Sequence, residues 1–300
     1  MANVTDFAFR EIISKYGKPD VMYTEFVSSE ALCSRGRDKI IHDLWFSESQ
    51  RPIIAQFFGT KPEQMRQTAE LAHELGFDGI DINMGCPDKN VLKQGAGASL
   101  IKNPRLAKEL ILAAKEGGGG LPVSVKTRIG FDKETLDEWL PQLLEVQPTA
   151  IIIHGRTKKE LSEVPAHWDM IAKAVKIRDE LKSDCLIVGN GDIKSLEEAR
   201  QKALETGVDG VMIGRGIFGN PWLFNEQKTH ISLQEKLLAL KEHILLFDAK
   251  FKDIKNFDIM KKHFKAYVSG FDNAKDLRVK LMDSKNAEEA LDILQNNLSP

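Results

Sequence analysis

Short apolar stretches alternate with longer amphipathic stretches over the first two-thirds of the chain, and this alternation limits the possible folds more than any other feature. It predicts seven strands, at residues 20–27, 52–58, 79–83, 122–128, 150–154, 185–190 and 209–214. Between them it predicts helices at 62–75, 104–116, 133–145, 168–181 and 195–205. Strands and helices that alternate in this way are typical of parallel βαβ units.

Polar or glycine residues stand at the end of nearly every predicted strand, and they decide between two parallel-sheet architectures. They are Glu25, Gln56, Asn83, Lys126, Arg128, His154, Asn190 and Gly214. A closed barrel gathers such residues around one mouth, whereas an open doubly wound sheet uses a single crevice. We therefore predict an α/β fold of the TIM (β/α)8 barrel type. Because the chain starts with a loop and a helix, capped by Thr5 or Asp6, we expect the first strand to lie upstream of Met1.

Composition excludes several classes of protein. The 300 residues carry a formal net charge of −2, so any nucleic-acid contact must be local. The three cysteines lie far apart without a CxxC pair, which argues against a disulfide framework or a metal site. The sequence shows neither a signal-peptide pattern nor an apolar run of membrane-spanning length. We expect a cytoplasmic protein that is a monomer and has no membrane partner.

The stretch from Gly79 to Pro87 is a candidate catalytic segment. Its strand ends at Asn83, and Cys86 follows in a turn where Pro87 requires an extended preceding residue. A polar amide at a strand end beside a thiol is a suitable place for chemistry. A single cysteine near a strand is, however, more often a small buried apolar residue. The spacing alone leaves both interpretations open.

Two glycine-containing loops are candidate phosphate sites. Residues 190–192 follow the sixth predicted strand, and residues 214–216 follow the seventh. Barrels often bind phosphate with the loops after their last two strands. The segment 214–219 also matches GxGxxG, but Asn220 and Pro221 interrupt the helix that a dinucleotide fingerprint requires.

From about residue 229 the strand–helix alternation stops, and helices are predicted at 233–251, 257–271 and 287–298. We place a domain boundary here, with a barrel domain at 1–228 and a helical domain at 229–300. One apolar stripe predicts a packed core: Met260, Phe264, Tyr267, Val268 and Phe271. Lys261, Lys262 and Lys265 fall beside it, and they either form a solvated face or contact a phosphate backbone.

Several motifs together make the chain resemble the tRNA-dihydrouridine synthase family over essentially its whole length. They are Val4-Thr5-Asp6, the segment 81–87, Gly95-Ala96-Gly97, residues 125–128, residues 154–157, residues 189–192 and residues 212–215. The order Asn-x-Gly-Cys-Pro, Lys-x-Arg and His-Gly-Arg-Thr at successive strand ends is highly specific. Relatives carry an Ala-Pro-Met strand end before the Val-Thr-Asp segment, where this sequence has only Met1.

The resemblance implies an FMN enzyme that reduces uridine in tRNA to 5,6-dihydrouridine with NADPH as electron donor. By the family pattern Cys86 is the general acid, and Asn83 and Arg128 lie beside the target pyrimidine. The implied FMN-binding residues are Gln56, Lys126, His154, Asn190, Gly191, Asp192, Gly214 and Arg215. Lys261, Lys262 and Lys265 would contact the tRNA backbone.

Three other functions compete with this one. A Schiff-base aldolase would use Lys126 as its nucleophile and would carry no flavin. A chain without its first strand could be a catalytically impaired tRNA-binding protein. A flavin barrel that reduces free pyrimidines would not need the basic helices.

Overall fold

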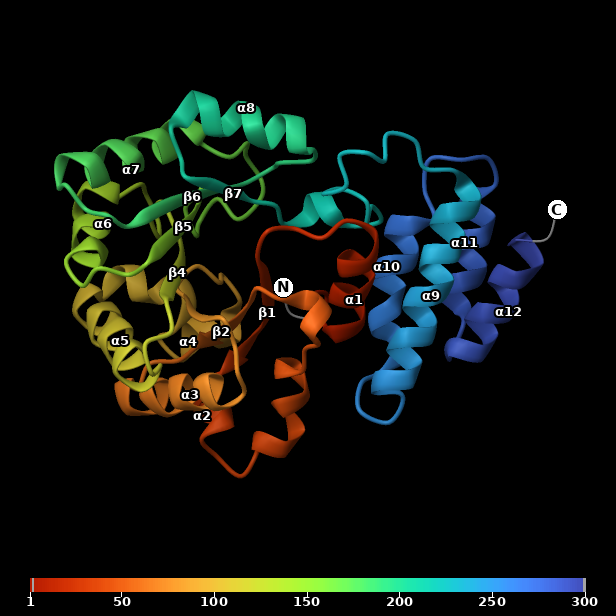
Figure 1. Cartoon of the computed structure of the whole chain (residues 1–300), viewed down its shortest axis with the longest axis horizontal. Helices are drawn as coiled ribbons and strands as arrows, with labels where there is room; N and C mark the ends of the chain where they lie inside the picture. The colour runs from red at the N-terminus through yellow and green to blue at the C-terminus, as the bar shows by residue number, and fades with distance from the viewer. Residues whose placement is uncertain (2, 299–300) are drawn as a thin grey trace. The chain divides into compact units, whose positions relative to one another are not determined.

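The computed structural model describes residue 1 and residues 3–298, and in it the chain forms two compact units. One unit consists of residues 23–45 and 52–215, and the other of residues 1–22, 46–51 and 216–300. Each unit is described by itself below. Figure 1 labels the helices and strands of both.

A seven-stranded sheet organises the first unit (Figure 1). Its strands are β1 (Met22–Ser28), β2 (Ile53–Phe58), β3 (Gly79–Asn83), β4 (Val123–Arg128), β5 (Ala150–His154), β6 (Leu186–Asn190) and β7 (Gly210–Met212). The strands are ordered β1 to β7 in chain sequence, and β2 to β7 pair in parallel. A doubly wound sheet reverses its strand order part way, so this uninterrupted order is that of a curled (β/α) barrel wall.

All seven predicted strands are confirmed, and so is the barrel class. One difference that concerns a site residue is in β7, which ends at Met212, so that Gly214 lies in the following loop and not in the strand. Among the described residues, β1 and β7 stand at the two ends of the strand order. The upstream strand stays a prediction.

Helices cover the sheet, and each packs on the next. They are α3 (Pro62–Glu74), α5 (Pro104–Gly117), α6 (Leu136–Leu144), α7 (Trp168–Glu180) and α8 (Leu196–Thr206). Two shorter helices, α2 (Ser29–Leu32) and α4 (Lys89–Lys93), lie in the loops after β1 and β3. The sequence predicted α6 to begin at 133, but Gly130 and Glu134 form an antiparallel bridge that delays its start. Apolar side chains of the strands, such as Ile82 and Val125, are fully buried.

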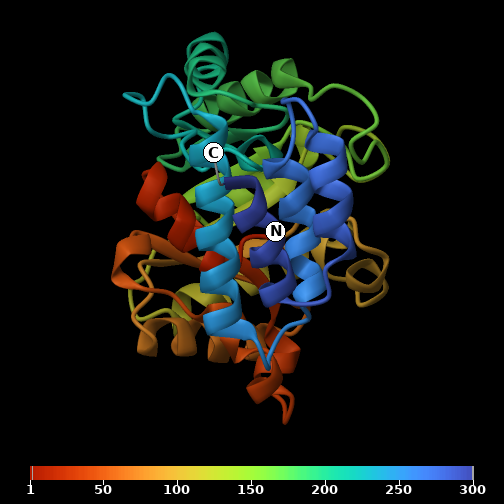
Figure 2. The ribbon, with the colours of Figure 1, turned by 90° about the vertical axis from the view of Figure 1, so that its right-hand side faces the viewer.

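The second unit is helical. It contains α1 (Phe7–Tyr16), α9 (Leu233–Phe251), α10 (Met260–Tyr267), α11 (Ala274–Asp283) and α12 (Ala287–Leu298). Figure 2 shows α9 to α12 (cyan to dark blue) running alongside one another. Asp6 caps α1 by accepting a hydrogen bond from the Phe9 N–H, as predicted. Ser232 and Glu235 form a capping box at the start of α9.

The helix predicted at 257–271 begins where it was predicted but extends too far at its C-terminal end, and α11 was missed. Residues 257–259 form a 3-10 turn, and α10 ends at Tyr267. Gly270 and Asn273 then adopt positive φ angles of 79° and 62°, which break the helix before α11. The predicted apolar stripe is buried at Met260, Phe264, Tyr267 and Val268, whereas Phe271 is only half-buried.

Candidate functional site

The polar strand ends of the first unit are brought together by the register of the sheet. Asn83 on β3 pairs with Lys126 on β4, and Arg128 pairs with His154 on β5. His154 in turn pairs with Asn190 on β6. Because parallel strands share the direction of their C-terminal ends, these side chains converge at one edge of the barrel wall.

The turn after β3 holds Cys86 in a defined position. The Asn83 side-chain Oδ1 accepts hydrogen bonds from the backbone N–H groups of Gly85 (3.1 Å) and Cys86 (2.9 Å). The Cys86 carbonyl accepts from the Ala98 N–H at 3.0 Å. Gly97 has a φ of +59°, and a Cβ there would lie 2.8 Å from the Cys86 carbonyl oxygen. A side chain at position 97 would therefore displace the cysteine loop.

The Cys86 thiol is half-buried, and this burial raises its pKa. The backbone N–H of Asp88 and the charge of Arg128 oppose this shift, while the Asp88 carboxylate adds to it. A thiol whose pKa lies above the ordinary range is protonated at neutral pH. Cys86 is therefore equipped to donate a proton, and not to act as a thiolate nucleophile.

The end of β4 contributes two cations with different surroundings. Lys126 donates from Nζ to Oδ1 of Asn190 at 2.8 Å, and the Asn190 Nδ2 donates to the Met212 carbonyl at 2.8 Å. Burial, with the charge of Arg128, lowers the pKa of Lys126 to about 7. Its charge is consequently sensitive to any anion that binds beside it.

Arg128 is buried, and its guanidinium donates to backbone carbonyls of the surrounding loops. Nε lies 2.7 Å from the Gly85 carbonyl oxygen, and Nη1 lies 3.1 Å from that of Thr157. Burial lowers the Arg128 pKa to about 10. The side chain thus ties the cysteine loop to the loop that follows β5.

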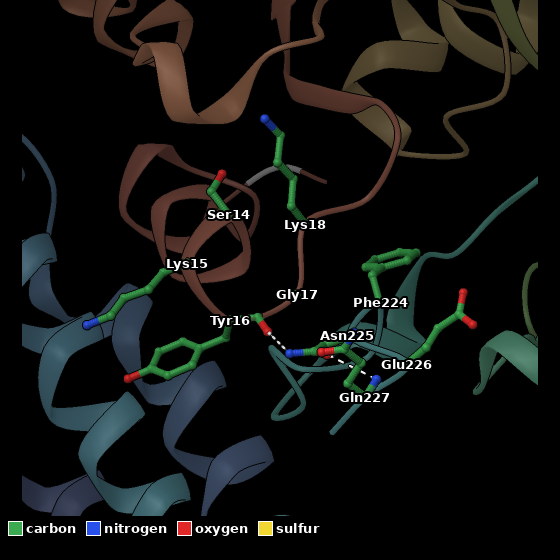
Figure 3. Close-up of a pocket in the computed structure, with 9 residues that line it drawn as sticks. All are labelled: Ser14, Lys15, Tyr16, Gly17, Lys18, Phe224, Asn225, Glu226 and Gln227. Atoms are coloured by element: carbon green, nitrogen blue, oxygen red, sulfur yellow. Dashed lines mark hydrogen bonds between the residues drawn. The ribbon is translucent and has the colours of Figure 1, made fainter. Parts of the chain in front are cut away.

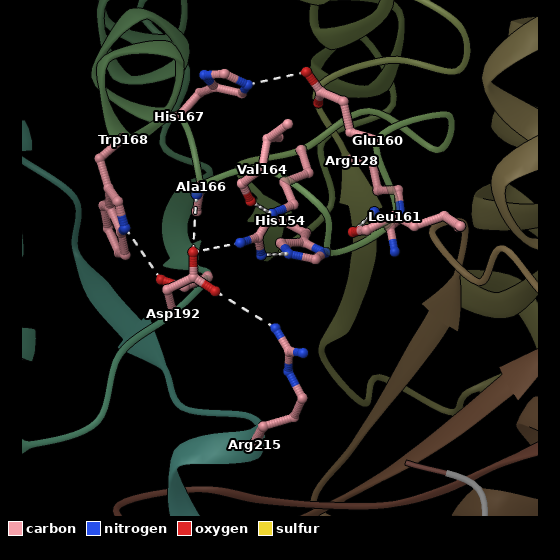
Figure 4. Close-up of polar contacts among 12 residues, drawn as sticks. Arg128, His154, Glu160, Leu161, Val164, Ala166, His167, Trp168, Asp192 and Arg215 are labelled. Carbon is pink, nitrogen blue, oxygen red and sulfur yellow. Dashed lines mark hydrogen bonds and ion pairs between the residues drawn. The ribbon is translucent and has the colours of Figure 1, made fainter.

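His154 lies among cations at the end of β5 (Figure 4). Burial and the charges of four nearby cations together lower its pKa to about 2. These cations are Lys126, Arg128, Arg156 and Arg215. The Nη1 atom of Arg156 lies 3.2 Å from the His154 Nε2. Because arginine only donates, Nε2 must accept, so the imidazole is neutral and carries its proton on Nδ1.

Asp192 faces the same cluster from the loop after β6. It accepts hydrogen bonds from Arg156 and from the Ala166 N–H, and Arg215 lies 3.5 Å from its other oxygen (Figure 4). Burial alone would raise its pKa, but these partners hold it below the ordinary value. Gly191 has a φ of +142°, and a Cβ there would lie 2.5 Å from the Ala166 Cβ. This loop therefore requires a glycine.

Two site residues were missed by sequence reasoning. Arg156, part of the His-Gly-Arg-Thr motif, is 2% exposed and links His154 to Asp192. Asp81 is fully buried on β3 and hydrogen-bonds Gln56. Both residues lie in motifs that the sequence analysis named. Their roles were missed because their hydrogen-bond partners lie on strands or loops that are distant in sequence.

The three candidate lysines lie on α10 in the helical unit. Lys262 and Lys265 are exposed, whereas Lys261 is half-buried and pairs with Asp258 at 2.7 Å. The same unit contains a pocket of about 560 Å³ between the end of α1 and residues 224–227 (Figure 3). None of the predicted site residues lines this pocket. Among the described residues no helix is long and apolar enough to cross a membrane, and no cluster of metal ligands is found.

A curled parallel sheet with cationic and amide side chains at its strand ends places the protein in the (β/α)-barrel class. The fold resembles the old yellow enzyme homologue from Zymomonas mobilis, at 14% identity over 77% of this chain and 85% of that one, with a TM-score of 0.52. It also resembles histamine dehydrogenase from Rhizobium sp. 4-9, at 13% identity over 79% of this chain and 45% of that one, with a TM-score of 0.54.

The sequence specifies the family. The model of the dihydrouridine synthase (Dus) family matches residues 1–299. A probable tRNA-dihydrouridine synthase 2 of Bacillus subtilis (strain 168) is 43% identical over 99% of this chain and 91% of its own length. A probable tRNA-dihydrouridine synthase of Staphylococcus aureus (strain MRSA252) is 42% identical over 98% and 90%. The chain belongs to the dihydrouridine synthase family, a family of oxidoreductases.

Proposed function

We propose that this protein is an FMN-dependent tRNA-dihydrouridine synthase that reduces uridine in tRNA to 5,6-dihydrouridine, with NADPH as the electron donor. The observation that carries the proposal is a thiol kept protonated by burial, on a loop joined through Arg128 to a cluster of cations. That pairing suits a reaction in which negative charge develops on a ring that must then gain a proton.

The donor set fits a flavin with a phosphate group. Four cations lower the pKa of His154, while Asp192 supplies a carboxylate within their hydrogen-bond network. In this proposal Asn190, Gly191, Asp192, Gly214 and Arg215 hold the phosphate. Gln56, Lys126 and His154 contact the rest of the cofactor, with His154 offering its Nδ1–H as a donor.

The reaction assigns separate tasks to the chain's own residues. Reduced FMN, when bound, supplies the hydride that reaches uracil C6. Charge then develops on C5 and O4, where the Lys126 and Arg128 cations stabilise it. The Cys86 thiol gives its proton to C5 and becomes a thiolate, which takes a proton back from solvent. Asn83, at the base of the cysteine loop, orients the pyrimidine.

The tRNA substrate requires a surface beyond the strand ends. The target base must leave its stack, at a cost of a few kcal/mol, and contacts to the phosphate backbone offset that cost. We assign these contacts to the helical domain at 229–300, with Lys261, Lys262 and Lys265 on α10. The enzyme acts as a cytoplasmic monomer in this proposal.

The test begins with the visible spectrum of the purified protein, which should be that of an oxidised flavin. With NADPH and unmodified tRNA, mass spectrometry should detect dihydrouridine. Cys86→Ala should keep the flavin spectrum and lose roughly 10²–10⁴-fold in rate, the usual contribution of a general acid. Cys33→Ala, at an exposed thiol, is the matched control and should keep full activity. A colourless protein would overturn the flavin assignment, and an active Cys86→Ala would remove the cysteine from its role.

One observation favours a second function. A lysine with a pKa of about 7 on a barrel strand is also suited to Schiff-base chemistry. Family membership favours the reductase over this aldolase. Borohydride treatment with carbonyl substrates separates the two, since only an aldolase would form a stable adduct on Lys126.

A further inference from the structure

A fully buried carboxylate, Asp81, lies at the middle of β3 and has no part in the chemistry described above. Its Oδ2 accepts from Nε2 of Gln56 at 2.7 Å, and its Oδ1 accepts from the Ser124 hydroxyl at 2.6 Å. The charge of Lys126 acts on it electrostatically, and Asp81 in turn raises the pKa of Tyr23. Burying a carboxylate is costly, so its retention in a barrel wall calls for a reason.

The carboxylate is one end of a chain of hydrogen bonds that leads to the cysteine loop. Gln56 donates to Asp81 with Nε2 and accepts with Oε1 from the Asn83 Nδ2 at 3.2 Å. The Asn83 Oδ1 then accepts from the N–H groups of Gly85 and Cys86. These hydrogen bonds therefore lead from β3 to β2, back to β3, and into the cysteine loop.

The chemistry of its two ends allows only one orientation of the amides between them. Backbone N–H groups can only donate, so Asn83 must present its oxygen to the loop and its NH₂ to Gln56. Gln56 must then present its oxygen to Asn83 and its NH₂ to the buried side, where Oδ2 of Asp81 accepts. Without an acceptor at position 81, the Gln56 NH₂ would be buried without a partner, and the amides would lose their preferred orientation.

We propose that Asp81 is a positioning residue that orients Gln56 and Asn83 and thereby holds the Cys86 loop in place. The role of the positioned Cys86 thiol in proton donation rests on the function proposed above, but the effect of Asp81 on the loop does not. The alternative is that Asp81 only contributes to the stability of the barrel wall.

Three substitutions distinguish these roles. Asp81→Asn keeps an oxygen for Gln56 and turns its NH₂ to Ser124, whose hydroxyl can donate to the Ile80 carbonyl at 3.3 Å. Asp81→Leu fills a similar space and removes the acceptor. Ser124→Ala is the matched control, because it removes a partner of Asp81 but leaves the chain to Cys86 intact.

The readout is the rate of alkylation of Cys86 by iodoacetamide, followed by peptide mass spectrometry. A Cys33→Ser background removes the exposed thiol. Cys185, buried in the same unit and with a pKa raised to about 12, reports on unfolding. The proteins are used as purified. The parent protein from which the flavin has been removed serves as a reference, because its Cys86 alkylation rate shows the effect of cofactor loss alone.

Asp81→Leu should make Cys86 react at least about fivefold faster than this flavin-free reference, because a released loop exposes the thiol, while Cys185 stays unreactive. Asp81→Asn and Ser124→Ala should stay within about twofold of the parent. Gln56→Leu breaks the hydrogen-bond chain one step nearer the loop, so its Cys86 alkylation rate should equal that of Asp81→Leu. The double variant should react little faster than either single variant.

Equal Cys86 rates in the parent and in Asp81→Leu, with Cys185 protected, would overturn the proposal. So would acceleration in Gln56→Leu alone, which would show that Gln56 orients Asn83 without Asp81. If Asp81→Leu also exposes Cys185, that variant has unfolded, and Gln56→Leu with Cys185 protected is used in its place. An unchanged Cys86 alkylation rate in Gln56→Leu would then overturn the proposal. None of these rates depends on turnover, so a parent without flavin or dihydrouridine formation would refute the proposed function separately.

Discussion

The Nζ atom of Lys126 on β4 lies 2.8 Å from Oδ1 of Asn190 on β6, so a hydrogen bond passes across the end of the intervening strand β5. The Asn190 amide continues to the Met212 carbonyl on β7. Three strand ends are thereby joined through two side chains. The arrangement places a desolvated cation next to the loops assigned to the cofactor phosphate.

Lys126 should titrate far below an ordinary lysine. Its pKa is lowered to about 7 by burial and by Arg128, whereas a lysine in an unfolded peptide has a pKa of about 10.4. Reductive methylation with ¹³C-formaldehyde and NMR should show one dimethyl-lysine signal with a midpoint near 7 in flavin-free protein. Lys126→Met identifies that signal by its loss. A parent spectrum in which every signal titrates near 10 would contradict the burial of this cation.

Asp192→Asn should destabilise the barrel unit. Arg156 is buried, and the substitution removes the charge that balances it, so we expect a loss of about 1–3 kcal/mol in the free energy of unfolding. Urea unfolding measures this loss. Glu109→Gln, which breaks the exposed Arg105–Glu109 pair, should change stability by less than about 0.5 kcal/mol. Equal effects of the two substitutions would show that Arg156 does not need its partner.

The helical unit should lose stability in mild acid. His243 and His263 are fully buried, their ring centroids are 4.5 Å apart, and no ring nitrogen has a hydrogen-bond partner among the described residues. Burial lowers the pKa of His263 to about 3 and that of His243 well below its ordinary value. Since an unfolded histidine has a pKa of about 6.5, the unfolded state binds more protons, and stability falls as pH drops from about 6.5 towards 3.

Each of these histidines should lower the free energy of unfolding with a slope that rises from half of its limit at pH 6.5 towards the limit of ~1.4 kcal/mol per pH unit near pH 5. Unfolding by denaturant between pH 6.5 and 5, where few carboxylates titrate, measures the slope. The double variant His243→Leu/His263→Leu should flatten it, and His230→Gln, at an exposed position, should not. An unchanged slope in the double variant would mean that neither imidazole is buried in its neutral form.

Lys262 and Lys265 should contribute to tRNA binding more than Lys261 does. Both are exposed on α10, while Lys261 already pairs with Asp258. Lys262→Ala/Lys265→Ala should weaken binding and reduce the slope of log affinity against log salt by about 1 per lysine. Lys176→Ala/Lys182→Ala removes the same charge from two exposed positions, one on α7 and one just after it, and should leave the slope unchanged. A slope equal to that of the parent would identify the α10 lysines as a solvated face.

Much of the fold could be predicted from local patterns. The seven strands, the helix boundaries of α3, α5 and α9, and the cap at Asp6 depend on residues close in sequence. The break between α10 and α11 was missed because it depends on positive φ angles at Gly270 and Asn273, which the apolar stripe does not reveal.

The sequence by itself determined the strands and helices of the barrel, the family and the residue types at each strand end, because alternation and motif spacing are properties of neighbouring residues. Only the tertiary structure decided which of these residues meet: Arg156 with His154 and Asp192, Asp81 with Gln56, and Lys126 with Asn190. It also decided the direction of the pKa shifts, because burial lowers the pKa of Lys126 to about 7 and raises that of Cys86. Desolvation and hydrogen-bond partners come from strands that are distant in the chain, and no local pattern specifies them.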